Sequence, residues 1–254
     1  MTRILLRISY DGGAYGGWQI QPNAPTVQQR LQQAALDLFG APTPVTGAGR
    51  TDSGVHALGQ AAHLDTDRAI PAAKIAPALN ARLPRDIRVT HSQRVPETFH
   101  ARFSAHEKTY RYCFHVGEQP PALFRQYCFH AGRELDLAAM ERAAGQLTGR
   151  HDFSAFQDVG RPVADATRTL SAVTLQAWDP FVLLTVTGEG FLYHMVRIIA
   201  GTLWQVGLGK REAELTAALA PGGRTACGPT APAWGLTLVS VAYPPEDLGE
   251  NPEK

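Results

Sequence analysis

The sequence predicts an α+β fold with two related halves, each of which combines a sheet with helices. Segments typical of strands and of helices mix along the chain without the strict alternation of a parallel α/β fold. The length of 254 residues is enough for one large domain or for two smaller ones that share an interface. The hydrophobic fraction of 44% and the charged fraction of 19% are ordinary globular values, so an ordered protein is expected.

The first half is expected to hold three strands and two helices. An apolar strand over residues 3–10 ends at Asp11-Gly12-Gly13. Thr26 is expected to cap a helix, with Gln29 completing a capping box, and Gly40 to end it. The other elements expected are a strand over 45–65 interrupted by a turn at 49–54, a helix near 72–82 and a strand near 87–95.

The second half repeats a similar plan. Asp136 is expected to cap a helix, and Asp179-Pro180 to join two strands as a hairpin. The elements expected are strands over 107–116, 168–178, 181–188 and 236–243, a helix near 191–206 and a short helix at 211–219. The division expected is a half over 1–105 that carries the turn, a half over 106–243, and a disordered acidic tail over 244–254.

Several classes of protein are disfavoured by composition. No run of eighteen apolar residues occurs, so no membrane span is expected. The apolar run after Arg3 is too short for a signal peptide. Three scattered cysteines do not suit a disulfide framework or a zinc knuckle, which favours a reducing, cytoplasmic location.

Basic residues gather in one stretch although the net charge is only +1. Because a guanidinium matches phosphate geometry, such a cluster suits RNA. An arginine-rich composition from a GC-rich genome is the other explanation for the excess of arginine over lysine. The cluster over residues 82–111 consists of Arg82, Arg85, Arg88, Arg94, Arg102, Lys108 and Arg111.

The turn over residues 49–54 holds an aspartate, Asp52, between two glycines. Such an aspartate can simply cap its own backbone. A hydrolase triad of Ser53, His56 and Asp52 is disfavoured because the three lie within five residues and no strand-turn-helix elbow is present. His56 and His63 lack a third metal ligand at suitable spacing and are expected to be structural. Residue types alone leave the role of Asp52 open.

Five blocks in order, from residue 10 to residue 243, resemble the TruA family of tRNA pseudouridine synthases. They are Tyr10-Asp11-Gly12 with Gly17-Trp18-Gln19; Gly49-Arg50-Thr51-Asp52-Ser53-Gly54-Val55-His56-Ala57; Ala101-Arg102-Phe103-Ser104-Ala105 with Lys108-Thr109-Tyr110-Arg111-Tyr112; Phe191-Leu192-Tyr193-His194-Met195-Val196-Arg197; and Ala233-Trp234-Gly235-Leu236-Thr237-Leu238 with Val241-Ala242-Tyr243. Together they are spread over nearly the whole length of the chain.

The resemblance implies site residues and their roles. It makes Asp52 the nucleophile, which suits a side chain that is ionised at neutral pH without a base. It makes Tyr110 the active-site tyrosine that packs on the flipped uracil, and Arg197 the basic partner of the nucleophile. Arg50 would hold the target nucleotide out of the stack. Apart from the resemblance, Arg102 and Arg111 of the basic cluster are expected to bind substrate phosphates.

The resemblance also implies the fold, substrate and assembly. The fold would be the pseudouridine synthase fold, with two halves around a shared mixed or antiparallel sheet and a central cleft, active as a homodimer. The reaction would be isomerisation of uridine to pseudouridine at positions 38, 39 and 40 of the anticodon stem-loop of tRNA. No metal or organic cofactor is implied.

Two other functions are alternatives to this one. A non-catalytic RNA-binding module would use Tyr110 and Tyr112 as a stacking platform, but it has no use for the anion of Asp52 where RNA approaches. Trp18 is either a further stacking residue or a structural one. An aspartate-dependent glycosidase needs a second carboxylate, and Asp37 is the only other acid between Thr26 and Gln60.

Overall fold

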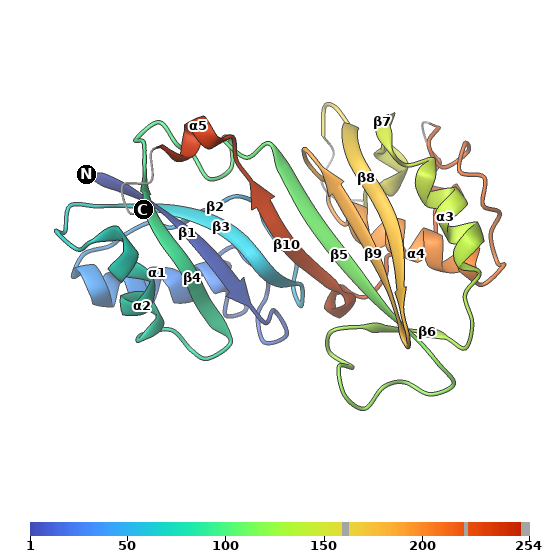
Figure 1. The fold of residues 1–254 in the computed structure, drawn as a ribbon, viewed down its shortest axis with the longest axis horizontal. Helices are drawn as coiled ribbons and strands as arrows, with labels where there is room; N and C mark the ends of the chain where they lie inside the picture. Colours follow the sequence, from blue (N-terminus) through green and yellow to red (C-terminus); the bar gives the residue numbers. More distant parts are fainter. Residues whose placement is uncertain (159–162, 221–222, 250–254) are drawn as a thin grey trace. The chain divides into compact units, whose positions relative to one another are not determined.

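The computed structural model describes residues 1–158, 163–220 and 223–249 and has the expected α+β architecture (Figure 1). It divides into two compact units. One comprises Met1–Lys108 with Leu238–Lys254, and the other comprises Thr109–Thr237.

The first unit is built on a sheet in the strand order β4-β1-β3-β10, in which β1 is antiparallel to both β3 and β4. β1 lies between two partners, with Leu6 opposite Ala62 on β3 and opposite Ser92 on β4. Ile4, Leu5 and Leu6 are all buried, so both faces of this central strand are covered. The strands are β1 (Thr2–Tyr10), β2 (Thr46–Gly47), β3 (His56–Thr66), β4 (Ile87–Val95) and β10 (Leu236–Ala242), with β2 paired to β3.

Two helices, α1 (Val27–Phe39) and α2 (Ala72–Asn80), contact each other in this unit (Figure 1). The predicted ends of α1 are confirmed. The Thr26 hydroxyl accepts from the backbone N–H of Gln29, and Gly40 ends the helix with a left-handed φ of 73°. Val27, Leu31 and Ala35 form the buried face.

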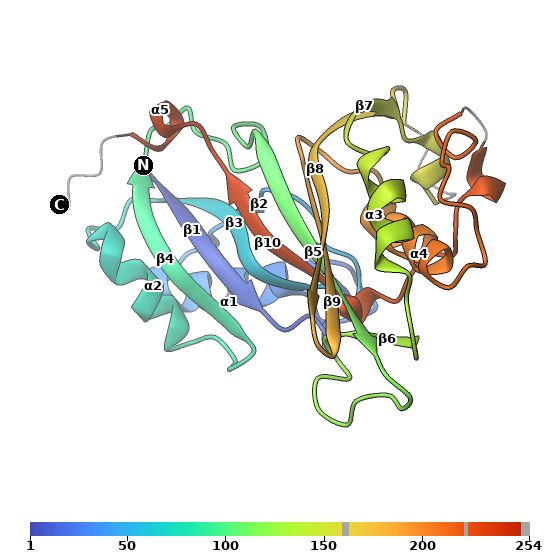
Figure 2. The same ribbon diagram turned by 45° about the vertical axis from the view of Figure 1, so that its right-hand side comes forward.

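The second unit follows the strand order β5-β9-β8-β7. The predicted hairpin is confirmed, because Trp178 on β8 lies opposite Phe181 on β9 across Asp179-Pro180. The strands are β5 (Glu107–Val116), β6 (Phe129–Gly132), β7 (Gly149–Asp152), β8 (Thr167–Trp178) and β9 (Phe181–Gly188), with β6 parallel to β5. The helices α3 (Leu137–Gly145) and α4 (Met195–Gly207) lie side by side, and α3 contacts β8 (Figure 2). Asp136 caps α3 by accepting from Ala139 N–H.

Two helix predictions in this unit are wrong in part. The helix expected from residue 191 begins only at Met195, because His194 adopts a left-handed conformation that a continuous helix excludes. No helix forms over 211–219, where the backbone is turns and bends. There Gln146 accepts from the N–H of Leu215 and donates to the carbonyl of Ala213, so a side chain takes the place of intrahelical partners.

The C-terminal segment departs from the expected division of the chain. Residues from Leu238 onward belong to the first unit rather than to a half over 106–243. The Tyr243 hydroxyl donates to the carbonyl of Ala101, and Arg7 donates to the carbonyl of Val241. These bonds to residues distant in the sequence hold the end of the chain in the first unit. In the segment expected to be disordered, α5 (Pro245–Leu248) forms a short helix with proline at its first turn; the rest of that expectation, over 250–254, lies outside the described residues. Among the residues described, no helix has the length and apolar character needed to span a bilayer.

Candidate active site

The turn that carries Asp52 is held by the loop that follows β1. Trp18 N–H donates to the carbonyl of Thr51 at 3.1 Å, and the Tyr10 hydroxyl lies 2.8 Å from Thr51 Oγ1. Gly54 N–H donates to the carbonyl of Tyr15 at 3.3 Å. Burial raises the pKa of Tyr10 to about 12, so its hydroxyl stays neutral. Asp52 is half-buried. It lies in a turn that is fixed on both sides of it, at Thr51 and at Gly54.

Two glycines allow this close approach. Gly54 ends the turn with a left-handed φ of 79°, which non-glycine residues adopt at a cost. Gly17 has a φ of 96°, and a Cβ on it would lie 2.6 Å from the carbonyl oxygen of Thr51. Gly49, the other glycine of the turn, does not have a positive φ.

Other residues of the first unit that could have served in stacking, metal binding or a catalytic triad have structural roles instead. Trp18 is 3% exposed and packs over Gly47, so it belongs to the core and is not open to a base. His56 is buried, with Nδ1 3.1 Å from Gly12 N. The Ser53 hydroxyl donates to the carbonyl of Tyr15, which gives no support to a Ser-His-Asp triad. His63 is also buried, and its Nδ1 accepts from Ala101 N–H.

Positive charge gathers beside this turn within the first unit. Arg50 and Arg102 are exposed. The Lys108 ammonium lies beside Gly49, 3.4 Å from where a Cβ would stand. Burial, and then the charge of Arg102, lowers the pKa of Lys108. The sequence places Lys108 in the basic cluster but does not predict that it lies at this turn, because Lys108 and Gly49 are 59 positions apart.

The second unit holds Tyr110, Arg111 and Arg197. Tyr110 on β5 is 8% exposed, and its ring meets the Phe191 ring edge-on at 5.0 Å. Burial alternates along the strand here, since Tyr110 and Tyr112 are buried and Arg111 is exposed. His115 breaks it by also being buried.

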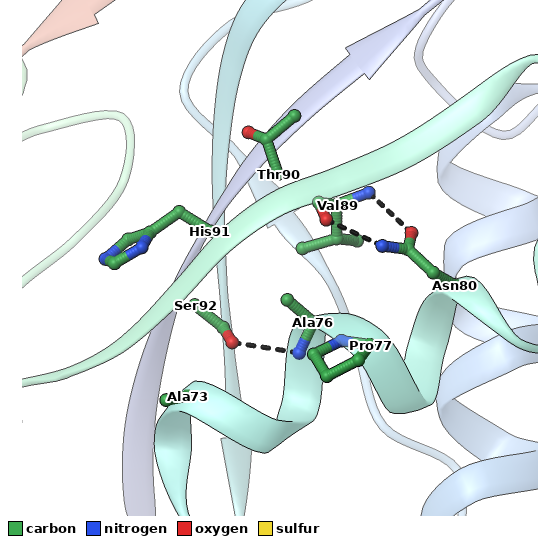
Figure 3. Close-up of a pocket in the computed structure, with 8 residues that line it drawn as sticks. All are labelled: Ala73, Ala76, Pro77, Asn80, Val89, Thr90, His91 and Ser92. Atoms are coloured by element: carbon green, nitrogen blue, oxygen red, sulfur yellow. Dashed lines mark hydrogen bonds between the residues drawn. The ribbon is translucent and has the colours of Figure 1, made fainter.

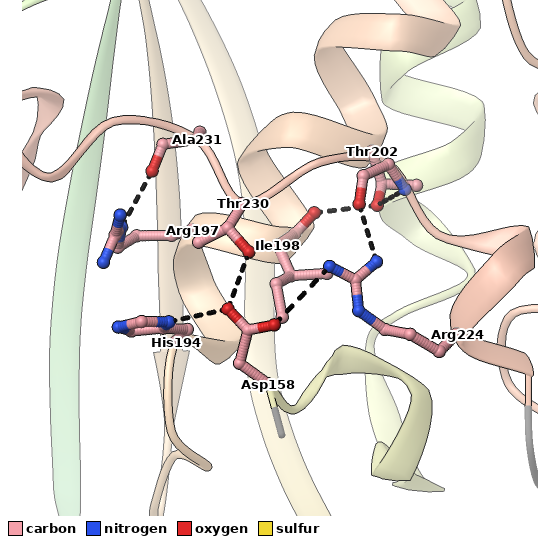
Figure 4. A network of polar contacts seen from close by, with 9 residues as sticks. Asp158, His194, Arg197, Ile198, Thr202, Arg224, Thr230 and Ala231 are labelled. Atoms are coloured by element: carbon pink, nitrogen blue, oxygen red, sulfur yellow. Dashed lines mark hydrogen bonds and ion pairs between the residues drawn. The ribbon is translucent and has the colours of Figure 1, made fainter. Parts of the chain in front are cut away.

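Arg197 lies on the first turn of α4 and is half-buried. Its Nε donates to the carbonyl of Ala231 at 2.8 Å, which fixes the start of the guanidinium plane. Figure 4 shows this bond beside a network centred on Asp158, to which His194 and Thr230 both bind. Asp158 was not among the residues expected from the sequence, since it lies in none of the five blocks.

A separate pocket lies between α2 and β4, and its polar groups are already paired (Figure 3). Asn80 exchanges two hydrogen bonds with the backbone of Val89, and Ser92 bonds to the backbone of Ala72 and Ala76. None of the expected site residues lines it. It is therefore a packing feature. Within the described parts of the chain, no group of three or more His, Cys, Asp or Glu side chains is placed to hold a metal ion.

Comparison with known proteins gives one consistent result. The family model described as tRNA pseudouridine synthase matches residues 7–104 and 143–244. A protein of Ruminiclostridium cellulolyticum named tRNA pseudouridine synthase A is 47% identical over 245 residues, covering 96% of this chain and 100% of the relative. Proteins with the same name from Acetivibrio thermocellus and Rhodospirillum rubrum are each 45% identical, covering 96% and 97% of this chain and 100% and 89% of the relatives. The chain therefore belongs to the tRNA pseudouridine synthase family, whose members are isomerases that act on tRNA.

Proposed function

We propose that this protein converts uridine to pseudouridine at positions 38, 39 and 40 in the anticodon stem-loop of tRNA. The observation that carries the proposal is the identity of 43–47% to proteins named tRNA pseudouridine synthase A over 93% or more of the chain. A non-catalytic RNA-binding module gains no support from these relatives, because their names describe enzymes.

Asp52 is the proposed nucleophile. The reaction breaks the bond from ribose C1′ to uracil N1 and forms one from C1′ to C5, and the proton lost from C5 is balanced by one gained at N1. No oxidant, reductant or cofactor is consumed. A carboxylate serves such a step when it is charged and held in place. The bonds that Thr51 and Gly54 make to the preceding loop supply that rigidity.

Tyr110 and Arg197 are proposed to assist Asp52. The edge-on contact with Phe191 holds the Tyr110 ring in one orientation, which suits stacking on a uracil and proton transfer through the hydroxyl. Arg197 is proposed as the cationic partner of the nucleophile, with its Nε committed to Ala231. A partly buried cation is stabilised by a charged partner, which favours this role.

Arg50, Arg102 and Arg111 are proposed to bind the RNA. All three are exposed, so they can reach phosphates. Arg50, two residues before Asp52, is placed to hold an extruded nucleotide, a step that costs a few kcal/mol. An enzyme that modifies several adjacent positions would recognise the shape of the stem-loop more than its sequence. A homodimer in the cytoplasm, where tRNA is available, completes the proposal.

The direct test is incubation of the purified protein with unmodified tRNA, followed by mapping of pseudouridine. Formation at positions 38 to 40 is expected without added metal and with a chelator present. Asp52→Asn and Asp52→Ala are expected to abolish it while tRNA binding and the melting temperature change little. Asp37→Asn, which alters an exposed carboxylate on α1, is the matched control and should remain active. Modification confined to another arm, or turnover by Asp52→Asn free of deamidated protein, would contradict the proposal.

A salt series tests the proposed phosphate contacts separately. Each phosphate neutralised by an arginine releases counterions, so log affinity should fall linearly with log salt concentration. Arg102→Gln and Arg111→Gln should each reduce that slope by about one contact. An unchanged slope would show that these arginines do not contact RNA.

A further inference from the structure

The Asp158 carboxylate connects two segments that are distant in the sequence. Its Oδ2 accepts from His194 Nδ1 at 2.8 Å and from the Thr230 hydroxyl at 3.0 Å (Figure 4). Arg224 approaches the other oxygen, Oδ1, at 3.8 Å. The hydrogen bond from His194, followed by that from Thr230, lowers the pKa of Asp158, so the carboxylate stays charged at neutral pH.

The first of these partners has a strained backbone. His194 precedes α4 with φ 61° and ψ 7°, a left-handed conformation that is uncommon for residues other than glycine. Such a conformation persists only where surrounding contacts impose it. The bond to Asp158 is one of those contacts. The stacking of the His194 ring on Tyr193, with centroids 3.7 Å apart, is another.

The two hydrogen-bond partners of Asp158 lie in the two segments that hold Arg197. His194 sets where α4 begins, three residues before Arg197, and its carbonyl accepts the helical bond from Ile198 N–H. Thr230 precedes Ala231, whose carbonyl accepts from Arg197 Nε and whose N–H donates to the carbonyl of Arg197. The backbone of Arg197 and the beginning of its guanidinium are thus fixed by the two segments that Asp158 joins.

We infer that Asp158 is a positioning residue for Arg197, acting through His194 on the helix start and through Thr230 on the acceptor loop. The inference rests on the proposed function in one respect, namely that Arg197 takes part in the reaction. Loss of Asp158 is therefore expected to disturb chemistry more than substrate binding.

The test compares Asp158→Asn and Asp158→Ala with the wild type under saturating tRNA. Asparagine retains one acceptor oxygen but not the charge, and alanine removes both bonds. Asp158→Ala is expected to lower kcat about tenfold or more with KM within about twofold, the pattern of an interaction needed in the transition state. Asp158→Asn should fall between. Arg224→Gln is the matched control, because it removes the 3.8 Å approach to Oδ1 and leaves the partners of Oδ2, His194 and Thr230, unchanged, so kcat should stay within about twofold.

Changes at His194 separate positioning from general stability. Asn Nδ2 and His Nδ1 are attached at the same side-chain position, and asparagine accepts the left-handed conformation. His194→Asn should therefore recover most of the turnover that His194→Ala loses. If the two residues act as a unit, Asp158→Ala combined with His194→Ala will be no slower than the worse single variant.

One measurement does not depend on activity. The NMR signal of the Arg197 Nε–H group, assigned by its loss in Arg197→Lys, should shift and exchange faster in Asp158→Ala but not in Arg224→Gln. If the Arg197 signal shifts in Asp158→Ala but the wild-type protein forms no pseudouridine, the inference about positioning stands and the proposed function is refuted. A folded Asp158→Ala with wild-type kcat and an unchanged Arg197 signal would overturn the inference.

Discussion

Gly17 gives a sharp test of how the Asp52 turn is held. In Gly17→Ala, the added methyl group would stand 2.6 Å from the carbonyl oxygen of Thr51 and 3.1 Å from the carbonyl carbon of Asp52. Both are backbone atoms, so no side chain can rotate away to make room. The φ of 96° adds a second cost, because a residue with a Cβ resists this conformation.

The magnitude follows from these two effects. A left-handed conformation costs about 1–2 kcal/mol for a residue with a Cβ. Overpacking of one methyl group costs about 1–3 kcal/mol, because neighbouring atoms must move. The free energy of unfolding should therefore fall by roughly 2–5 kcal/mol, and the melting temperature by roughly 5–20 °C. The turn that relaxes is the one bearing Asp52, so kcat should fall at least about tenfold.

Gly13→Ala is the matched control within the same loop. Gly13 is exposed and has no positive φ, and its Cβ would meet only the end of the Asp11 side chain at 3.1 Å. Its melting temperature and turnover should stay near those of the wild type. Thermal unfolding monitored by circular dichroism and a single-turnover assay of pseudouridine formation measure the two effects. A Gly17→Ala protein as stable and as active as Gly13→Ala would refute the packing account of the turn.

Three further predictions concern single side chains. Burial, and then the charge of Arg3, lowers the pKa of His63 to about 4 from 6.5, so an NMR titration should find it neutral down to that range. The unfolded chain then binds the extra proton first, and the free energy of unfolding should decrease by up to roughly 3 kcal/mol as pH falls from about 6.5 to 4. Asp65 accepts two 2.8 Å hydrogen bonds from Arg3, and these bonds lower the pKa of Asp65. Asp65→Asn should therefore lower the free energy of unfolding by about 0.5–1 kcal/mol at pH 7, measured by urea unfolding. The difference from wild type should vanish as the pH falls below the pKa of Asp65 in the folded protein. Tyr110→Phe should lower turnover while preserving tRNA affinity and the melting temperature, and unchanged turnover would restrict Tyr110 to stacking.

Local hydrogen-bonding rules made several elements predictable. Thr26 and Asp136 begin helices because their side chains accept from an N–H three residues ahead, and no distant contact is needed. Gly40 ends α1 for an equally local reason. The hairpin across Asp179-Pro180 also forms between neighbouring segments. The motif blocks that predicted the family are runs of consecutive residues, and the family comparison confirmed them.

The failures share a different cause. The segment 211–219 has its backbone bonded by Gln146, which lies 67 and 69 positions from its partners. The final strand is drawn to the first unit by bonds such as that between Tyr243 and Ala101, 142 positions apart. Helical periodicity and chain order carry no information about such partners.

The sequence by itself determined the family, the order of most elements and the turn that carries Asp52. Only the tertiary structure decided that Lys108 lies beside that turn and that Asp158 joins the two segments framing Arg197. The left-handed conformation of His194 could not be predicted from the sequence either, because a residue other than glycine rarely adopts it. Local propensity acts over a few residues, whereas these side chains are placed by partners 36 to 72 positions away, which only the folded chain brings within hydrogen-bonding distance.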